Sequence, residues 1–266
     1  MKNIIGCLTG EMGWIIATEI PYYRWLSKKH PVVLVGPEWC KYLCSDFVNM
    51  YVPHDYKSKN GPDNWVVDRY PTVRPYIPKG IMKSLRSGFA DEWSEVVPDE
   101  KRCMSKKKKK YRKYGDFALS AVPILIHART ADKYGQEKRN WSTQKWESFV
   151  SAFADRYIAS IGSAGGAHHI NGTMDWRGIR TKDLCTFTHN AVVVGTSSGP
   201  MHLASHCGAP HVVITGKEPQ KALGGKTNRY RYEKLWNPFN TPCTVLDSHK
   251  WQPPVDVVVN AVKEYL

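Results

Sequence analysis

The sequence lacks an apolar run long enough to cross a bilayer. Its apolar runs, such as Ala191 to Val194, fall far short of the roughly 18 to 20 residues that a spanning helix needs. The first residues enter a strand pattern directly, without the long apolar core and cleavage site of a signal peptide. We therefore expect no transmembrane segment and a cytoplasmic protein.

Closely spaced cysteine pairs are also missing. The seven cysteines are widely scattered and form no Cys-x-x-Cys pair. This pattern predicts reduced, mostly buried thiols and no metal site.

Apolar residues, in contrast, are plentiful. The 266 residues are 42% hydrophobic and 12% aromatic, which excludes a disordered chain or a disulfide scaffold and leaves one large domain or two small ones.

Acidic residues are absent from one strongly basic segment, Lys101 to Lys113, which holds nine cations. The whole chain has a net charge of +14, so the remaining residues carry only +5. A solvated loop is the plainest interpretation. There are two alternative, functional interpretations. The segment could contact an anionic membrane surface or lipopolysaccharide, or it could contact DNA phosphates. The candidate polyanion contacts are Lys106, Lys107, Lys108, Lys109 and Lys110.

Hydrophobic periodicity predicts two α/β lobes. The first begins with a strand over 3–8, a helix over 14–29 and a strand over 30–35. In the second, strands alternate with helices and a closing helix covers the C-terminus. The expected strands are 122–127, 157–161, 191–194 and 211–215, and the expected helices are 143–156, 181–189, 200–207 and 255–266. We expect an acceptor-side Rossmann-like lobe over 1–115 and a nucleotide-sugar-binding lobe over 116–266.

The segment that follows the strand over 191–194 has the pattern of an anion site. The turn Gly195 to Gly199 precedes Pro200, a residue suited to the first turn of a helix. Unpaired backbone N–H groups at such a helix start, with hydroxyls from Thr196, Ser197 and Ser198, would hold a diphosphate. The alternative is an ordinary turn in which a serine caps the helix.

This segment also carries a family resemblance. It contains Gly-x-x-Ser-Gly-Pro-x-His-x-Ala from Gly195, followed by Gly-x-Pro-x-Val-x-x-x-Gly from Gly208. Both patterns resemble the nucleotide-sugar-binding lobe of the heptosyltransferase-like glycosyltransferases of family 9, and the likeness covers about 123–247. The family usually has Asp where this chain has Ser197. The resemblance implies a GT-B fold of two Rossmann-like lobes, here with a shortened N-terminal lobe.

The resemblance also implies roles for individual residues. Glu11 matches the carboxylate that deprotonates the acceptor hydroxyl, in a loop with Gly10, Gly13 and Trp14. The residues that it places at the donor are Arg129, Thr130, Lys138, Arg139, Gly162, Ser163, Thr196, Ser197, Ser198, Gly199 and His202.

The resemblance implies a glycosyltransferase that uses a nucleotide-diphosphate sugar, inverts the sugar and needs no metal or other cofactor. Its acceptor would be a saccharide of the envelope-glycan or lipopolysaccharide type, and the enzyme would sit in the cytoplasm or peripherally at the inner membrane surface. Two alternatives stay open. One is a phage-type DNA glycosyltransferase that modifies a hydroxymethylated base. The other is a catalytically silent protein that binds a nucleotide sugar or a polyanion.

Overall fold

The computed structural model describes residues 3–8, 12–53, 93–96, 105, 107, 109–115, 122–130, 137–219 and 225–266. The chain folds into two compact units, Met1–Arg112 and Lys113–Leu266. Each unit contains a parallel sheet, so the expected α/β fold class is confirmed. The roles assigned to the two lobes remain predictions.

The first unit contains a four-stranded parallel sheet in the order β3-β2-β1-β4. Strands β1 and β2 are buried along their whole length, which explains their nearly continuous apolar sequences. The expected β-α-β opening is therefore confirmed, with pairing that runs from Ile4 opposite Val32 to Cys7 opposite Val35. The strand bounds are β1 (Asn3–Cys7), β2 (Val32–Gly36), β3 (Met50–Pro53) and β4 (Trp93–Val96).

The first long helix is interrupted by a wider, π-helical turn. It consists of α1 (Met12–Trp14), the π-helical segment Ile15–Glu19 and α2 (Ile20–Leu26), whereas the sequence predicted one helix over 14–29. Pro21 in α2 has no N–H to donate to the preceding turn. The Lys109 ammonium donates instead to the Ala17 carbonyl oxygen at 3.1 Å. A lysine from the basic segment thus supports the helix near its proline.

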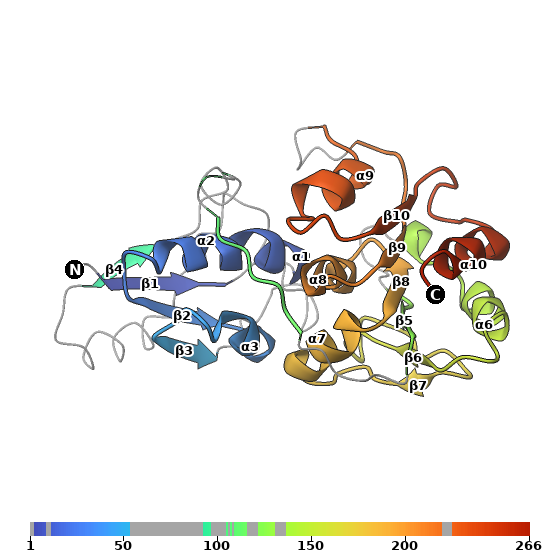
Figure 1. The fold of residues 1–266 in the computed structure, drawn as a ribbon, viewed down its shortest axis with the longest axis horizontal. Coiled ribbons are helices and arrows are strands. Elements are labelled where there is room, and N and C mark those ends of the chain that lie inside the picture. Colours follow the sequence, from blue (N-terminus) through green and yellow to red (C-terminus); the bar gives the residue numbers. More distant parts are fainter. Residues whose placement is uncertain are drawn as a thin grey trace. The chain divides into compact units, whose positions relative to one another are not determined.

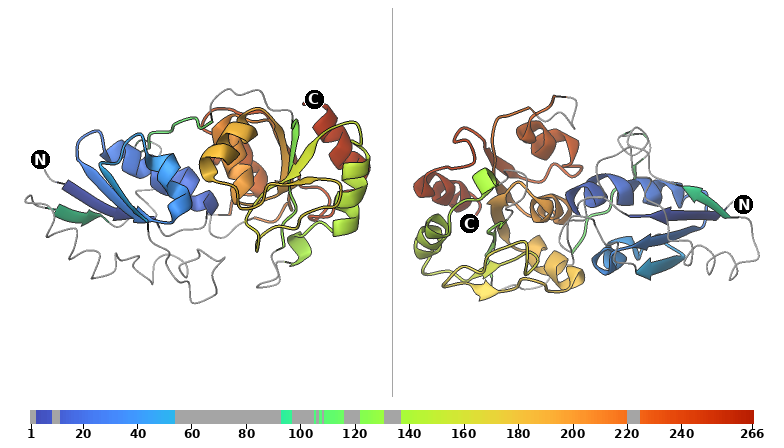
Figure 2. Two further views of the ribbon diagram at one scale, coloured as in Figure 1. Left: turned by 90° about the horizontal axis from the view of Figure 1, so that it is seen from below. Right: turned by 180° about the vertical axis from the view of Figure 1, so that it is seen from behind.

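Two further short helices of this unit were not predicted. A 3-10 turn, Glu38–Cys40, leads into α3 (Lys41–Cys44). This helix lies against α2, where the buried Arg24 donates to the Leu43 carbonyl oxygen at 2.8 Å. Figure 2 shows the sheet and helices of the unit from two further sides.

The second unit contains a six-stranded parallel sheet in the order β10-β9-β8-β5-β6-β7 (Figure 1). The four expected strands are all present, within two residues of the predicted ends. The sequence analysis missed the two edge strands, which are short or only partly buried. The bounds are β5 (Ile124–His127), β6 (Ile158–Ser160), β7 (Met174–Asp175), β8 (Val192–Thr196), β9 (His211–Ile214) and β10 (Cys243–Leu246).

Helices cover both faces of this sheet (Figure 1). One face is covered by α6 (Thr143–Ser151) and α10 (Val255–Lys263), and the other by α7 (Thr181–His189) and α8 (Gly199–Cys207). On the first face Trp146, Phe149 and Val258 are fully buried in one apolar cluster. A helical segment precedes β10 that the sequence analysis did not predict. It consists of α9 (Asn228–Tyr230) and the π-helical turn Arg231–Leu235.

Among the described residues, no helix combines the length and apolar character that crossing a membrane requires. Six cysteines fall within the described part of the chain, and all of them are free. Five of these thiols are buried, as predicted, and Cys243 is half-buried. Cys103 lies outside the described residues.

Candidate functional site

The order of the strands singles out one place in the second unit. From β5 the chain builds outward through β6 to β7, and it then returns to the other side of β5 and builds outward through β8 and β9 to β10. Strands β5 and β8 are neighbours, with Ile124 opposite Val192 and His127 opposite Gly195. Open parallel sheets bind ligands outside the carboxyl ends of the two strands where the order reverses. The candidate site therefore lies at the ends of β5 and β8.

A hydrogen bond joins the two strand ends at this place. His127, the last residue of β5, has its Nδ1 atom 2.9 Å from the Ser198 Oγ atom. The Ser198 hydroxyl donates its single proton to the Thr196 carbonyl oxygen at 2.8 Å, so His127 must donate through Nδ1. Burial, together with the charge of Arg129, lowers the pKa of His127 to about 3. The imidazole is therefore neutral and holds the serine in a fixed orientation.

This arrangement leaves the start of α8 without a side-chain cap. Ser198 is the residue before the helix, but its side chain makes no capping hydrogen bond. The Ser198 N–H group donates to the Tyr232 hydroxyl at 3.1 Å. The start of α8 at Gly199 thus has no side-chain cap, and the positive end of the helix dipole there suits an anion. Pro200 has no N–H group, and the His202 N–H donates to the Ser198 carbonyl oxygen at 3.4 Å. The alternative of an ordinary serine-capped turn does not fit this geometry.

The loops after β5 and β6 meet on one side of this point. Arg129 pairs in an antiparallel bridge with Ala167, and the Thr130 hydroxyl donates to the Gly165 carbonyl oxygen at 3.1 Å. Gly162 has a φ of 125°, and a Cβ atom there would lie 2.8 Å from the His127 ring. Glycine is therefore required beside the histidine. The structure brings Arg129, Thr130 and Gly162 together here, and the exposed Ser163 follows Gly162.

Arg139 lies further along the connection from β5 to α6. It ends a 3-10 turn, Glu137–Arg139, and its Nη2 atom donates to the Ser197 carbonyl oxygen at 3.1 Å. Its guanidinium lies over the Trp251 ring, 4.3 Å from the ring centroid. Lys138 precedes it and is exposed. The connection between β5 and α6 therefore brings cationic side chains near the α8 start, where a diphosphate would need them.

Three of the predicted donor residues are buried instead of facing outward. Thr196 is fully buried, and Ser197 is 3% exposed with its hydroxyl accepting a hydrogen bond from Tyr232 at 3.1 Å. His202 is also 3% exposed and stacks on the Tyr232 ring, with 4.4 Å between the ring centroids. Burial, with a contribution from the Arg231 charge, places the pKa of His202 well below its usual range. These side chains shape the helix start from behind, and their contact with a donor stays a prediction.

The predicted residues of the first unit fall partly outside the described residues. This applies to Gly10 and Glu11 of the expected acceptor loop. Gly13 and Trp14 lie in α1.

Of the five lysines in the predicted polyanion contact, Lys106 and Lys108 lie outside the described residues as well. Lys107 and Lys110 are exposed, whereas Lys109 is half-buried and bound to Ala17.

Comparison with known proteins identifies the fold. No family model matches the sequence, and no curated protein matches it. Solved structures match over nearly the whole chain. The Escherichia coli ADP-heptose lipopolysaccharide heptosyltransferase II is 14% identical, with a TM-score of 0.61 over 99% of this chain and 98% of that one. A family 9 glycosyltransferase from Veillonella parvula is 10% identical, with a TM-score of 0.61 over 99% and 97%.

The E. coli heptosyltransferase WaaC, solved with ADP, has a TM-score of 0.60 over 100% of both chains at 12% identity. The chain has the heptosyltransferase fold. The GT-B expectation is thereby confirmed, because the likeness extends over both units of the chain. Identities of 10 to 14% establish the fold and leave the substrates to be argued from this chain's own residues.

Sequence analysis missed three residues that shape the site of this heptosyltransferase-like fold: His127, Tyr232 and Trp251. His127 had a detectable signal, since it is a polar residue at the end of a buried strand and stands two residues before Arg129. Tyr232 and Trp251 had none, because each comes from a segment far along the chain from the residue that it supports, Tyr232 being 35 residues beyond Ser197. Among the described residues, no group of three His, Cys, Asp or Glu side chains is arranged to hold a metal ion.

The buried histidines of the second unit predict a stability that falls on acidification. Burial lowers the pKa of His127 to about 3 and that of His211 to about 4, against a usual value of about 6.5 in the unfolded chain. The unfolded chain therefore binds more protons below about pH 6.5, and stability that is fully present above that pH is lost as the pH falls. Each histidine should cost about 2 kcal/mol at about pH 5.

Urea unfolding between about pH 7.5 and pH 5 measures this effect. We expect His211→Gln to flatten the pH dependence and the exposed His168→Gln to leave it unchanged. A wild-type unfolding free energy that stays constant over this interval would contradict the assignment of neutral buried histidines.

Proposed function

We propose that the protein is a glycosyltransferase that moves a sugar from a nucleotide-diphosphate sugar to an acceptor hydroxyl. One observation carries the proposal: the uncapped start of α8 lies at the switch point of the second sheet, with Arg129 and Arg139 of the β5 to α6 connection nearby. The fold supports it, because the structures that match over the whole chain are those of heptosyltransferases. ADP is bound in one of those structures.

The donor diphosphate would bind at the start of α8. The start of α8 would hold one phosphate through the Gly199 N–H group and the helix dipole. The Ser198 hydroxyl, which accepts from His127, would turn its proton from the Thr196 carbonyl oxygen to the phosphate. Arg129 and Arg139 would add charge-assisted hydrogen bonds. The nucleoside would then lie toward Gly162 and Ser163, which follow the neighbouring strand β6. Lys138, Thr130, Thr196, Ser197 and His202 complete the proposed donor site.

The departing diphosphate carries the charge that must be stabilised during transfer. A helix start with its dipole and two guanidinium groups supplies positive potential at that place without a metal ion. We therefore propose a transfer that does not depend on a divalent cation. Activity that survives a chelating agent would agree with this proposal, and an absolute requirement for Mn²⁺ or Mg²⁺ would contradict it.

The first unit would bind the acceptor. Its strand order reverses between β1 and β4, which are neighbours in the sheet, and Glu11 follows β1 by four residues in the sequence. A carboxylate after β1 suits a general base that removes the proton of the acceptor hydroxyl as the sugar is transferred with inversion. Gly10, Gly13 and Trp14 would shape the same acceptor side. The acceptor itself would be a saccharide of the envelope-glycan type.

Replacing the proposed base tests the reaction directly. Glu11→Gln keeps the size of the side chain but removes its basicity, so we expect transfer to fall at least about a hundredfold, the usual contribution of general base catalysis. Nucleotide release from a panel of nucleotide-diphosphate sugars measures transfer, and thermal stabilisation by the same sugars measures donor binding.

We expect donor binding to be unchanged in Glu11→Gln. Glu38→Gln, at an exposed carboxylate of the same unit, is the matched control and should keep full transfer. Transfer retained by Glu11→Gln would contradict the role of Glu11. A wild-type protein that binds a nucleotide sugar but transfers nothing to saccharide acceptors or to DNA would contradict the enzymatic proposal and favour a silent binding protein.

Replacing Arg139 tests the donor site separately. Arg139→Met removes a charge-assisted hydrogen bond worth about 1.5 to 3 kcal/mol, so we expect nucleotide-diphosphate binding to weaken about tenfold to a hundredfold. Calorimetric titration with ADP, and with whichever nucleotide sugar stabilises the protein most, measures the change. Arg156→Met, at an exposed arginine of the same unit, is the control. Equal affinities for the Arg139 variant and the wild type would remove Arg139 from the site.

A further inference from the structure

A hollow of about 480 Å³ in the first unit is not used by the proposed transfer reaction. Among the described residues its lining includes Arg24, Lys28, Lys29 and Lys110 against one carboxylate, Asp46. These groups leave a net charge of +3. Lys28, Lys29 and Lys110 are all exposed, so their ammonium groups are accessible to a ligand in solution.

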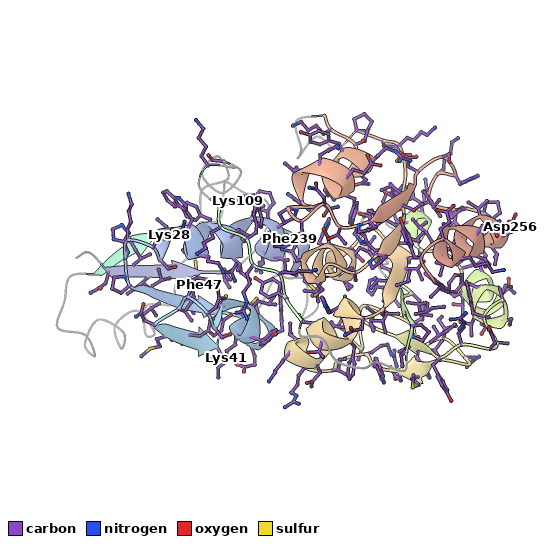
Figure 3. The ribbon with its side chains drawn as sticks, viewed as in Figure 1. Lys28, Lys41, Phe47, Lys109, Phe239 and Asp256 are labelled. Atoms are coloured by element: carbon purple, nitrogen blue, oxygen red, sulfur yellow. The ribbon has the colours of Figure 1, made fainter. Side chains whose placement is uncertain are left out.

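The hollow lies at the amino-terminal ends of the strands of the first sheet. Lys28 and Lys29 fall between the end of α2 at Leu26 and the start of β2 at Val32, and Asp46 precedes β3. Figure 3 labels Lys28 and, from the turn before β3, Phe47. The proposed acceptor loop follows the carboxyl end of β1, at the opposite edge of the same parallel sheet. The hollow is therefore separate from the edge that the transfer reaction uses.

The Asp46 carboxylate of the hollow is neutralised within the protein. The buried Arg24 donates through Nε and Nη2 to the two Asp46 oxygens, each at 3.0 Å. Arg112 adds a second contact to Asp46 at 3.3 Å. Burial opposes ionisation, but the two guanidinium groups hold the pKa of Asp46 below its usual range. Asp46 thus stays ionised and paired, and no ion pair to Lys28, Lys29 or Lys110 is found within the described part of the chain.

The basic segment brings one of these lysines to the hollow in a fixed position. The Lys110 N–H group donates to the Pro21 carbonyl oxygen at 2.9 Å, and its own carbonyl oxygen accepts from Arg24 at 3.4 Å. Lys109 next to it is bound to Ala17. This part of the segment is therefore packed along α2 instead of forming a solvated loop, and it holds Lys110 beside Lys28 and Lys29.

We propose that this hollow binds a phosphate group of headgroup size, carried either by an anionic lipid or by a free phosphodiester. Three lysines around a concave surface suit one phosphate with its polar substituent. The hollow offers little to a nucleic-acid strand, which would need stacking platforms for its bases. The aromatic ring that the described residues contribute to its lining, Phe47, is covered by the Arg24 guanidinium at 4.8 Å from the ring centroid.

A charge-matched pair of variants tests the site in the full-length protein, without any nucleotide sugar. The hollow variant is Lys28→Gln, Lys29→Gln and Lys110→Gln. The control variant is Lys182→Gln, Lys234→Gln and Lys263→Gln, which removes the same charge from exposed positions of the second unit. Sedimentation with phosphatidylcholine vesicles, with and without phosphatidylglycerol, measures lipid binding. Titration with glycerophosphoglycerol measures binding of the free headgroup.

We expect the hollow variant to bind phosphatidylglycerol vesicles about a hundredfold more weakly than the wild type and the control variant to bind within about threefold of it. Selective loss with vesicles alone identifies the lipid as the source of the phosphate, and selective loss with the free headgroup identifies a soluble phosphodiester. If the triple variant melts early, Lys28→Gln and Lys29→Gln singly, each expected to weaken binding about fivefold, replace it.

Three results would overturn the proposal. The first is an equal loss in both triple variants, which would mean attraction by net charge alone. The second is wild-type binding to DNA, lost in the hollow variant, with no binding of either phosphate probe. The third is no binding of vesicles or free headgroup by the wild type.

Discussion

The hydrogen bond between His127 and Ser198 is the interaction on which the candidate site depends. It joins the ends of β5 and β8, the two neighbouring strands at which the order of the sheet reverses. Because the serine hydroxyl is engaged by Thr196 and His127, it does not cap α8. The helix start is thus left for a ligand, and burial keeps the histidine that fixes this arrangement neutral. A charged imidazole there would disturb both the packing and the orientation of the serine.

Local sequence signals predicted the parts of the site that are continuous in the chain. The strand, turn and helix around Gly195 to Cys207 were expected nearly as they are, since an apolar run followed by glycines, serines and a proline has few alternative structures. The support behind this turn was not predictable. Tyr232 belongs to the π-helical segment Arg231–Leu235 and contacts Ser197 and His202. Trp251 follows β10 in the sequence, and its ring packs against the Arg139 guanidinium. Such contacts depend on tertiary packing, which leaves no periodic trace in the sequence.

In the first unit, too, tertiary contacts were not predictable from local sequence signals. Periodicity predicted its β-α-β opening, but it did not predict the π-helical turn inside the helix, which lies beside Pro21 and Lys109. Pro21 cannot donate to the preceding turn, and Lys109, almost ninety residues away in the sequence, donates to Ala17 in the widened helix. The basic segment was expected as a single charged device. Of its described residues, Lys109 supports the helix, Arg112 pairs with Asp46 and Lys110 lines the hollow.

A crystal structure of the full chain with ADP or a nucleotide-diphosphate sugar is the most direct test of the central claim. We expect the diphosphate to accept hydrogen bonds from the backbone of the first turn of α8, beside Ser198, with Arg139 in contact and the His127 to Ser198 hydrogen bond intact. A diphosphate bound at any other place, including the basic hollow of the first unit, would contradict the account.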